Sequence, residues 1–343
     1  MIRNEDISIV FQGMLPLETS PEYRPILANI ARVRCVFPDS PILLGLWEGC
    51  VVPQGLEIDL VVLSKDPGAL PSFKKNALHI ENNVNRQIFC SARVLKEVHT
   101  KYTLKLRLDC ELNHTGFLNY YAKFGKTSDG QERVAIPCFF TVDPRMYEQM
   151  PFHISDWFAF GPTVKIQKLW DVPFMSLDDS TYYDRNSFAA HSSYFDKLYR
   201  SRFAIEQHVA IHYAQYNGYT TPSFHNDASS EVLLSHDSFV ARELLILDLG
   251  QFGVNCQKYT KVLRSSFQQL NCLMFLDWYW LNVKNDTEFN VDILVYRAAE
   301  KRAKMKKLMR MGSKATNPLM PLIKQRLVKG CVSKILRTAM RLK

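Results

Sequence analysis

The pattern of apolar and polar segments in the first third of the chain predicts an α/β fold on parallel strands. Short apolar runs typical of buried strands lie at residues 7–11, 42–47 and 58–63. Segments with helical spacing alternate with them, at residues 25–34 and 81–99. Because open α/β sheets bind ligands at the carboxyl ends of their strands, we expect the functional residues at these ends.

A fourth strand is predicted at residues 102–112, where apolar and polar residues alternate strictly. Alternation with period two places alternate side chains on opposite faces of a strand. One face would carry Thr103, Lys105, Arg107, Asp109 and Glu111, and the other Leu104, Leu106, Leu108 and Cys110. The first face is therefore expected to be charged and the second to belong to the core.

The remaining segments continue the α/β pattern with less regularity. We expect strands at residues 133–142, 157–161 and 243–249, and helices at residues 203–213 and 266–280. There is no internal repeat and no low-complexity linker in the sequence. The fold class predicted is a Rossmann-type mixed sheet flanked by helices, followed by a basic amphipathic helical tail.

Composition places the chain among globular proteins with a large core, since 47% of its 343 residues are hydrophobic. None of the eight cysteines forms a CxxC pair, so we expect reduced thiols rather than a disulfide framework. The chain begins without the features of a secretory signal, and its longest apolar stretch, residues 270–283, is too short for a membrane span. A cytoplasmic protein is expected.

Positive charge is concentrated at the end of the chain. Residues 297–343 contain fifteen Lys and Arg and one acid, Glu300, a net charge of +14. Subtracting this from the total of +9 leaves −5 for residues 1–296. The basic character therefore belongs to the tail.

The tail is expected to contain two helical segments separated by a break at residues 312–321. In the second, residues 323–339 place apolar side chains on one face and Lys and Arg on the other, which is typical of a helix at a membrane interface. Docking on the cytoplasmic face of an anionic membrane is the favoured interpretation. Binding to nucleic acid and packing against the body of the protein are the alternatives.

Asp109 and Glu111 form a D-x-E pattern at the predicted end of the fourth strand. Two carboxylates that point the same way can bind one hard divalent cation such as Mg²⁺ or Mn²⁺. His225 could complete this site if its loop folds back. Acid-x-acid triplets are also common on solvated strand ends, so the pattern needs support from its context.

That context resembles one family. The order of elements is that of GT-A glycosyltransferases, in which an acid-x-acid motif follows the fourth strand. Six segments then resemble the WavE lipopolysaccharide-synthesis family: ISIVFQG at residues 7–13, LWEG at 46–49, VVLSKDPG at 61–68, NNVNRQ at 82–87, KYTLKLRLD at 101–109 and PFHISDWFAFG at 151–161. The resemblance implies transfer of a sugar from a nucleotide-sugar donor to a lipopolysaccharide core or another surface glycan, with a divalent metal.

The resemblance also suggests how the chain is divided. Residues 1–112 would bind the nucleotide, residues 113–296 the acceptor, and residues 297–343 a membrane. The candidate nucleotide-sugar ligands are Gln12, Gly13, Trp47, Glu48, Asp66, Asn85, Arg86, Lys105 and Arg107. Each also has an ordinary interpretation as a turn former, packing anchor, solvated helix start or ion-pair partner.

An acid at the start of the helix near residue 206 resembles the GT-A position that deprotonates the acceptor hydroxyl. Glu206 is therefore the first candidate for the base and Asp156 the second. His153 and Trp157, in the polar segment before an apolar strand, are candidates for acceptor binding. His208 and His212 have zinc-ligand spacing but lack the HExxH pattern, so ordinary polar roles are favoured.

Two alternative functions remain open. A nucleotidyltransferase on the same fold would show a glycine-rich phosphate loop after its first strand, and residues 12–14 contain a single glycine. A non-catalytic membrane-associated assembly protein of polysaccharide synthesis would keep its role without Asp109. The sequence has no Walker loop, GxSxG elbow or GxGxxG fingerprint, so nothing supports other common enzyme classes.

Overall fold

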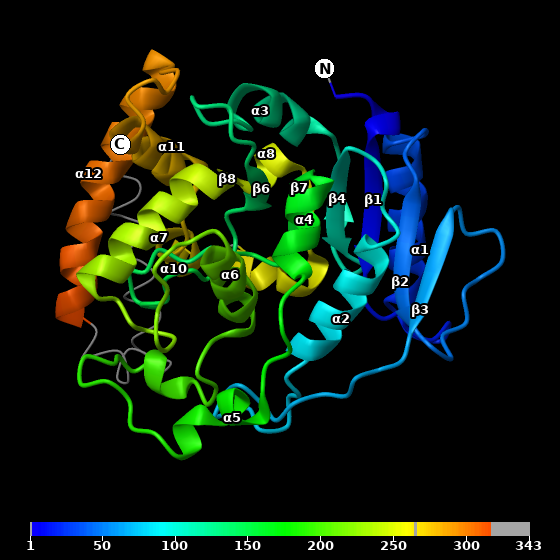
Figure 1. The fold of residues 1–343 in the computed structure, drawn as a ribbon, viewed down its shortest axis with the longest axis horizontal. Helices are drawn as coiled ribbons and strands as arrows, with labels where there is room; N and C mark the ends of the chain where they lie inside the picture. The colour runs from blue at the N-terminus through cyan, green and yellow to red at the C-terminus, as the bar shows by residue number, and fades with distance from the viewer. Residues whose placement is uncertain (1, 264–265, 317–343) are drawn as a thin grey trace.

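The computed structural model describes residues 2–263 and 266–316. A seven-stranded mixed sheet with the order β3-β2-β1-β4-β7-β6-β8 runs through the molecule, flanked by helices (Figure 1). The strands are β1 (Ile7–Gln12), β2 (Ile42–Trp47), β3 (Leu60–Ser64), β4 (Tyr102–Arg107), β5 (Glu111–Leu112), β6 (Val134–Pro137), β7 (Phe158–Pro162), β8 (Leu244–Leu247) and β9 (Val254–Asn255). The predicted α/β class is confirmed.

The helices of the N-terminal half are α1 (Tyr23–Val36), α2 (Val84–Leu95), α3 (Gly116–Phe124), α4 (Thr163–Trp170) and α5 (Leu177–Ser180). Those that follow are α6 (Ile205–Tyr216), α7 (Ser230–Glu243), α8 (Leu249–Phe252), α9 (Thr260–Leu263), α10 (Ser266–Asn271), α11 (Phe275–Asn285) and α12 (Ile293–Thr316). Of the predicted elements, β1, α1, β2, β3 and α6 appear within a few residues of their expected bounds.

The sheet reverses its order at β1, which lies between β2 and β4. The strands β3, β2, β1 and β4 are parallel, and β7 runs antiparallel to both β4 and β6. Crossovers between parallel strands are almost always right-handed. The connection from β1 to β2 through α1 and the connection from β3 to β4 through α2 run in opposite directions along the sheet, so α1 and α2 lie on opposite faces. The carboxyl ends of β1 and β4 therefore form a switch point, the usual ligand site of such sheets.

The predicted fourth strand, residues 102–112, is not continuous. β4 ends at Arg107, a turn follows, and β5 leaves the main sheet to pair with β9. β4 also lies at the centre of the sheet, so both of its faces are covered, and Lys105 is fully buried. The face that carries Lys105 and Arg107 is charged as expected, but it is covered by the rest of the protein.

Other elements also differ from the expected ones. Helices α3, α4 and α7 were not predicted, and the helix expected at residues 266–280 is divided into α10 and α11. The division occurs where the backbone N–H of Leu273 donates to the carbonyl of Thr141 at 2.7 Å and Cys272 forms a bridge with Val142. Pairing with a distant segment thus interrupts a locally helical sequence.

The first part of the basic tail packs on the body of the protein. α12 begins before residue 297, where the tail was expected to start, and continues past it. The helix also continues through Gly312, so the break expected at residues 312–321 is absent at least as far as Thr316. The Lys306 ammonium lies 3.0 Å from both Asp143 and Asp277, all three nearly or fully buried. The second predicted segment of the tail lies outside the described residues. Within residues 2–263 and 266–316, no helix is both long and apolar enough to cross a membrane.

Acid should weaken the attachment of α12. Burial alone would raise the pKa of Asp143 and of Asp277, but Lys306 and the neighbouring arginines outweigh it and lower both. A carboxylate with a lowered folded-state pKa contributes stability that is present above its unfolded pKa, about 3.9, and lost as the pH falls through the folded value. We expect the difference in unfolding free energy between wild type and Lys306→Met to hold from pH 7 to about pH 5 and to narrow as the pH falls below about 4 in urea titrations. A constant difference would contradict this linkage.

Candidate functional site

Polar side chains converge where β1 and β4 end. Gln12 and Arg107 are register partners at the last position of the two strands, and the N–H of Leu108 donates to the Gln12 carbonyl at 2.9 Å. Gly13 follows at a close approach, since a Cβ on it would lie 3.0 Å from the Cβ of Leu108. We name Gln12, Gln87, Lys105, Arg107, Asp109 and Asp156 the strand-end cluster.

Arg107 is the central cation of the strand-end cluster. Its Nε and Nη2 donate to the two carboxylate oxygens of Asp109, at 3.0 and 2.8 Å, and its Nη1 lies 3.6 Å from Asp156. Burial would lower the pKa of Arg107, but these two acids raise it. Arg107 also lowers the pKa of Asp109 against the opposing effect of burial. The planar guanidinium thus makes a bidentate contact with the Asp109 carboxylate, through two N–H groups and two oxygens. Arginine binds phosphate with the same geometry.

Asp156 is held from two other elements. The side-chain amide of Gln87 in α2 donates to one carboxylate oxygen at 3.1 Å, and the Lys105 ammonium donates to the Asp156 backbone carbonyl at 3.0 Å. Burial lowers the pKa of Lys105 to about 8, and its ammonium lies 4.0 Å from the centre of the Trp170 ring. The lysine is therefore a buried support for Asp156 and not an exposed phosphate ligand.

Several buried polar atoms of this region have no hydrogen-bond partner among the described residues. They are Oε1 of Gln12, Oε1 of Gln87, Oδ1 of Asp156 and Nε1 of Trp170. Buried polar atoms in native proteins are nearly always hydrogen-bonded, to protein or to water, so a group of unpaired ones requires an explanation. Three are acceptors and one is a donor, a set that hydroxyl groups can satisfy.

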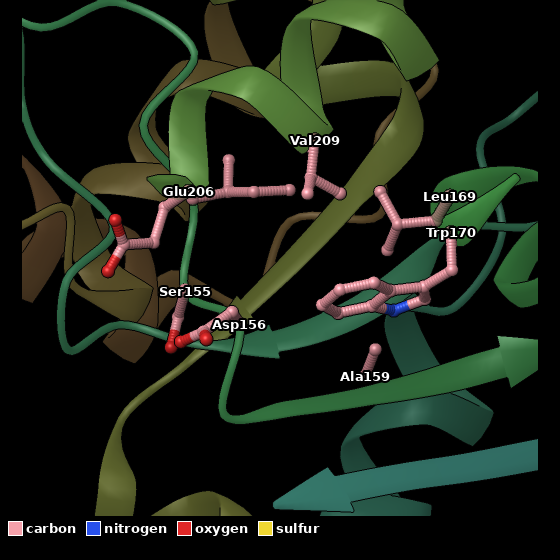
Figure 2. A pocket seen from close by; sticks show the side chains of 8 residues that line it. Ser155, Asp156, Ala159, Leu169, Trp170, Glu206 and Val209 are labelled. Carbon is pink, nitrogen blue, oxygen red and sulfur yellow. The ribbon is translucent and has the colours of Figure 1, made fainter. Parts of the chain in front are cut away.

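The two candidate bases line one small pocket. Figure 2 shows Ser155, Asp156 and Glu206 on one side of it and Leu169 and Trp170 on the other. Asp156 comes from the loop before β7 and Glu206 from the first turn of α6. The fold therefore brings together two acids that are fifty residues apart in the chain.

His153 connects Glu206 to the core. Its Nδ1 lies 2.7 Å from the carbonyl of Phe140, which can only accept, so Nδ1 carries a hydrogen. Its Nε2 faces the Glu206 carboxylate at 3.6 Å. His153 is buried and contacts this acid, so it is placed to orient Glu206 and not to meet an acceptor directly.

Trp157 is also inside the protein, at 1% exposure, and this contradicts its expected contact with an acceptor. Its ring stacks on Tyr259 with centroids 5.0 Å apart. Tyr259 is only partly covered, and it lies close enough to Arg107 and Asp109 for their charges to act on its pKa, which burial raises. Tyr259 is therefore a partly exposed aromatic side chain beside Arg107 and Asp109 of the strand-end cluster.

The expected metal ligands are not brought together. Among the described residues, Asp109, Glu111 and His225 do not form a group that could hold one ion. Asp109 is held by Arg107, and Glu111 lies in β5, where Asn255 donates to it at 3.3 Å. The His225 ring is fully buried and stacks on Tyr199. The residues present do not fit the divalent cation that the sequence suggested.

A different group surrounds Asp109. Its carboxylate and the thiols of Cys110 and Cys256 place ligand atoms within 4.8 Å of one another. The Cys256 thiol donates to the backbone carbonyl of Asp109 at 3.3 Å, and β5 and β9 hold the two cysteines side by side. Thiols are soft ligands, unlike the oxygen ligands that Mg²⁺ prefers, so this group does not replace the expected set.

The remaining candidates on the donor side have mixed positions. Trp47 ends β2 with its side chain partly covered, and Glu48 is exposed beyond it. Asp66 and Arg86 form a bidentate ion pair at the surface, and Arg86 also contacts Glu81. In this structure the N–H groups of Arg86 are engaged by these acids.

Asn85 has a structural contact instead of the expected sugar contact. Its amide accepts from the N–H of Met175 at 2.8 Å and donates to the Met175 carbonyl at 3.1 Å. Both ends of the side chain are thereby satisfied by backbone. Asn85 fixes the segment that precedes α5.

Sequence reasoning missed Gln87, Trp170 and Tyr259. Gln87 stands one residue after Arg86 in the NNVNRQ segment, so a helical projection of α2 could have placed it toward the sheet. Trp170 ends α4, and Tyr259 follows β9, with no motif around either. Only the packing of distant elements reveals these two.

Of the comparisons with known proteins, the family match agrees with the resemblance found in the sequence. No curated protein matches the chain significantly. Among solved structures, the chain is similar to the galactosyltransferase LgtC in complex with donor and acceptor sugar analogues, at 11% identity and a TM-score of 0.28. That match covers 47% of this chain and 59% of LgtC, so the chain spans less than two thirds of its length. The family match extends over residues 7–311, and the chain belongs to the WavE lipopolysaccharide synthesis family.

Proposed function

We propose that the protein is a glycosyltransferase that moves a sugar from a nucleotide-sugar donor to a lipopolysaccharide core or another surface glycan. The observation that carries the proposal is the set of unpaired buried polar atoms at the switch point, on Gln12, Gln87, Asp156 and Trp170. Sugar hydroxyls both donate and accept, so a bound sugar satisfies such a set. Membership in a lipopolysaccharide synthesis family supports the same class of acceptor.

The donor diphosphate is assigned to Arg107. Transfer breaks the bond between the anomeric carbon and the diphosphate, and the leaving oxygen gains negative charge that a fixed cation stabilises. Arg107 meets this need by exchanging the Asp109 carboxylate for phosphate oxygens, with the same fork geometry. Tyr259, partly exposed beside it, offers a ring for the nucleobase. No step is assigned to a metal, because the expected ligands do not fit one.

Glu206 is assigned as the base. It takes the proton from the acceptor hydroxyl, whose oxygen then attacks the anomeric carbon as the diphosphate leaves. Asp156 is less suited, because Arg107 and the amide of Gln87 already contact one oxygen of its carboxylate. Asp156 is therefore assigned to hold Arg107 and a sugar hydroxyl. His153, behind Glu206, keeps that carboxylate in place.

The acceptor would be a glycan anchored at the cytoplasmic face of an anionic membrane. α12 carries exposed cations, among them Lys301, Lys304, Lys307 and Lys314. Cations near an anionic leaflet contribute about 1 kcal/mol each, so a few of them suffice for reversible docking. Peripheral association through α12 would bring the acceptor to the protein.

Nucleoside diphosphates should stabilise the wild-type protein, because a ligand that binds only the folded state adds about 2.7 kcal/mol at one hundred times its Kd. Arg107→Met should abolish this stabilisation by the nucleotide. Arg86→Met is the control: it removes an arginine that is paired with acids at the surface, and the stabilisation should remain. The measurement is the shift in melting temperature with each nucleoside diphosphate, relative to each variant without ligand, in EDTA and in Mn²⁺.

The expected shift is the same in EDTA and in Mn²⁺. A shift that requires Mn²⁺ would show that Asp109 leaves Arg107 to bind a metal, which would contradict the metal-free assignment and keep the glycosyltransferase proposal. The absence of any shift with all nucleotides would argue against a nucleotide-sugar enzyme and favour an assembly role.

A further inference from the structure

A second polar pocket, of about 380 Å³, lies between α7, α11 and α12, on elements that do not contribute to the strand-end cluster. α11 packs against both other helices, at the side of the molecule opposite β3 (Figure 1). We name this the α12 pocket. Its lining includes six cations, Arg145, Lys284, Lys304, Lys306, Lys307 and Arg310. It includes three acids, Asp237, Asp277 and Glu300, so the excess is three positive charges.

Two of these cations have no acid partner among the described residues. Arg145 is paired with Asp237, Lys304 with Glu300, and Lys306 and Arg310 with the buried Asp143. The ammonium groups of Lys284 and Lys307 form no such pair within the described part of the chain, and both side chains are exposed. The ammonium of Lys284 lies over the face of Trp280, 5.0 Å from the ring centre. The charges of these two lysines are therefore available to a ligand.

His236 contributes a buried donor to the same pocket. The backbone N–H of Phe152 donates to its Nδ1 at 3.1 Å, so Nδ1 is the acceptor. Burial lowers the pKa of His236 to about 4, which makes the ring neutral at pH 7. A neutral imidazole with an accepting Nδ1 carries its hydrogen on Nε2. That Nε2–H is buried and has no acceptor in the part of the chain that the structure describes.

Arg310 supplies a second unpaired donor. Its Nη2 binds Asp143 at 2.9 Å, but its Nε–H is buried without an acceptor among the described residues. One water could satisfy one such group, but two unpaired donors beside free cations favour an acceptor with several charged oxygens. A liquid water occupies about 30 Å³, so the α12 pocket has room for a phosphate group and its hydration.

We propose that the α12 pocket is a phosphate-binding site, in which Lys284 and Lys307 neutralise the phosphate and the N–H groups of His236 and Arg310 bind its oxygens. Nothing in this proposal depends on the reaction assigned to the strand-end cluster. The phosphate could belong to an anionic lipid headgroup or to a soluble molecule. Because α12 begins the basic tail, a lipid phosphate would anchor the protein with this helix toward a membrane.

The test compares two double variants of equal charge. Lys284→Gln with Lys307→Gln removes the free cations of the α12 pocket, and Lys301→Gln with Lys314→Gln removes two exposed cations of α12 outside it. Binding of inorganic phosphate is measured by calorimetry, and the His236 Nε2 proton is followed by nitrogen-correlated NMR. We expect saturable binding that shifts this proton in wild type, a loss of about tenfold or more in the pocket variant, and less than twofold in the control.

If phosphate affinity falls equally in both variants, the loss follows from overall charge alone and the proposal is overturned. The absence of saturable phosphate binding to wild type would overturn it as well. A second arm distinguishes the sources of the phosphate. Both variants remove two exposed cations and so lose some binding to phosphatidylglycerol vesicles relative to phosphatidylcholine vesicles, but co-sedimentation should fall further in the pocket variant than in the control if the ligand is a lipid headgroup. If calorimetric binding falls and co-sedimentation falls no further than in the control, the site takes a soluble phosphate.

Discussion

Replacing Lys306 with methionine is expected to lower the free energy of unfolding by about 3–5 kcal/mol, the range for breaking one side of a buried ion pair. The Lys306 ammonium donates to Asp143 at 3.0 Å and to the carbonyl of Cys272 at 2.9 Å, and it forms an ion pair with Asp277 at 3.0 Å. Methionine keeps the length of the side chain and removes the charge. Arg302 and Arg310 would then be the nearest cations of these two buried acids.

The measurement is equilibrium unfolding in urea, followed by the fluorescence of the five tryptophans. Lys304→Met is the matched control, because Lys304 lies on the same helix, is exposed and pairs only with Glu300. Exposed pairs of this kind contribute a few tenths of a kcal/mol. Equal stability of wild type and Lys306→Met would show that α12 does not depend on this contact for its attachment.

Glu206→Gln is expected to reduce sugar transfer by about 100- to 10,000-fold, the usual contribution of a general base. Glutamine has nearly the same shape, so the contact of His153 with residue 206 can persist while the proton acceptor is lost. Because Glu206 is assigned to the acceptor and not to the donor, the variant should still bind nucleoside diphosphate. Steady-state transfer and thermal-shift titrations, measured side by side, separate these two effects.

Glu231→Gln provides the control, since it removes an exposed acid from the first turn of another helix, α7. Asp156→Asn should behave differently from both. It alters a partner of Arg107, so nucleotide binding should weaken together with transfer. If Glu206→Gln transfers sugar at the wild-type rate and Asp156→Asn does not, the two acids have exchanged the roles given to them here.

The sequence by itself determined the elements whose signals are local. Apolar runs were sufficient to predict β1, β2 and β3, and helical spacing was sufficient to predict α1 and α6. Burial in a sheet, or of one face of a helix, produces a regular pattern of apolar residues that is visible within a short stretch of sequence. The family resemblance also came from ordered local segments, and the match over residues 7–311 confirms it. Both acids that line the first pocket were identified at this level, from their positions before β7 and at the start of α6.

Only the tertiary structure decided which charged residues are partners. The sequence predicts Lys105 on the charged face of a strand. In the structure both faces of β4 are covered, and the Lys105 ammonium donates to the backbone carbonyl of Asp156. Asp109 reads as a metal ligand, yet Arg107 takes its carboxylate.

The basic tail gives the clearest case, since Lys306 binds Asp143 from 163 positions away. The position of a charged residue in the sequence does not show whether its side chain will be buried or which residue it will contact. Desolvation makes an unpaired buried charge very unfavourable, so a charged side chain that is buried needs a partner of opposite charge. That partner comes from a distant segment of the chain, and it decides the role of the charged residue.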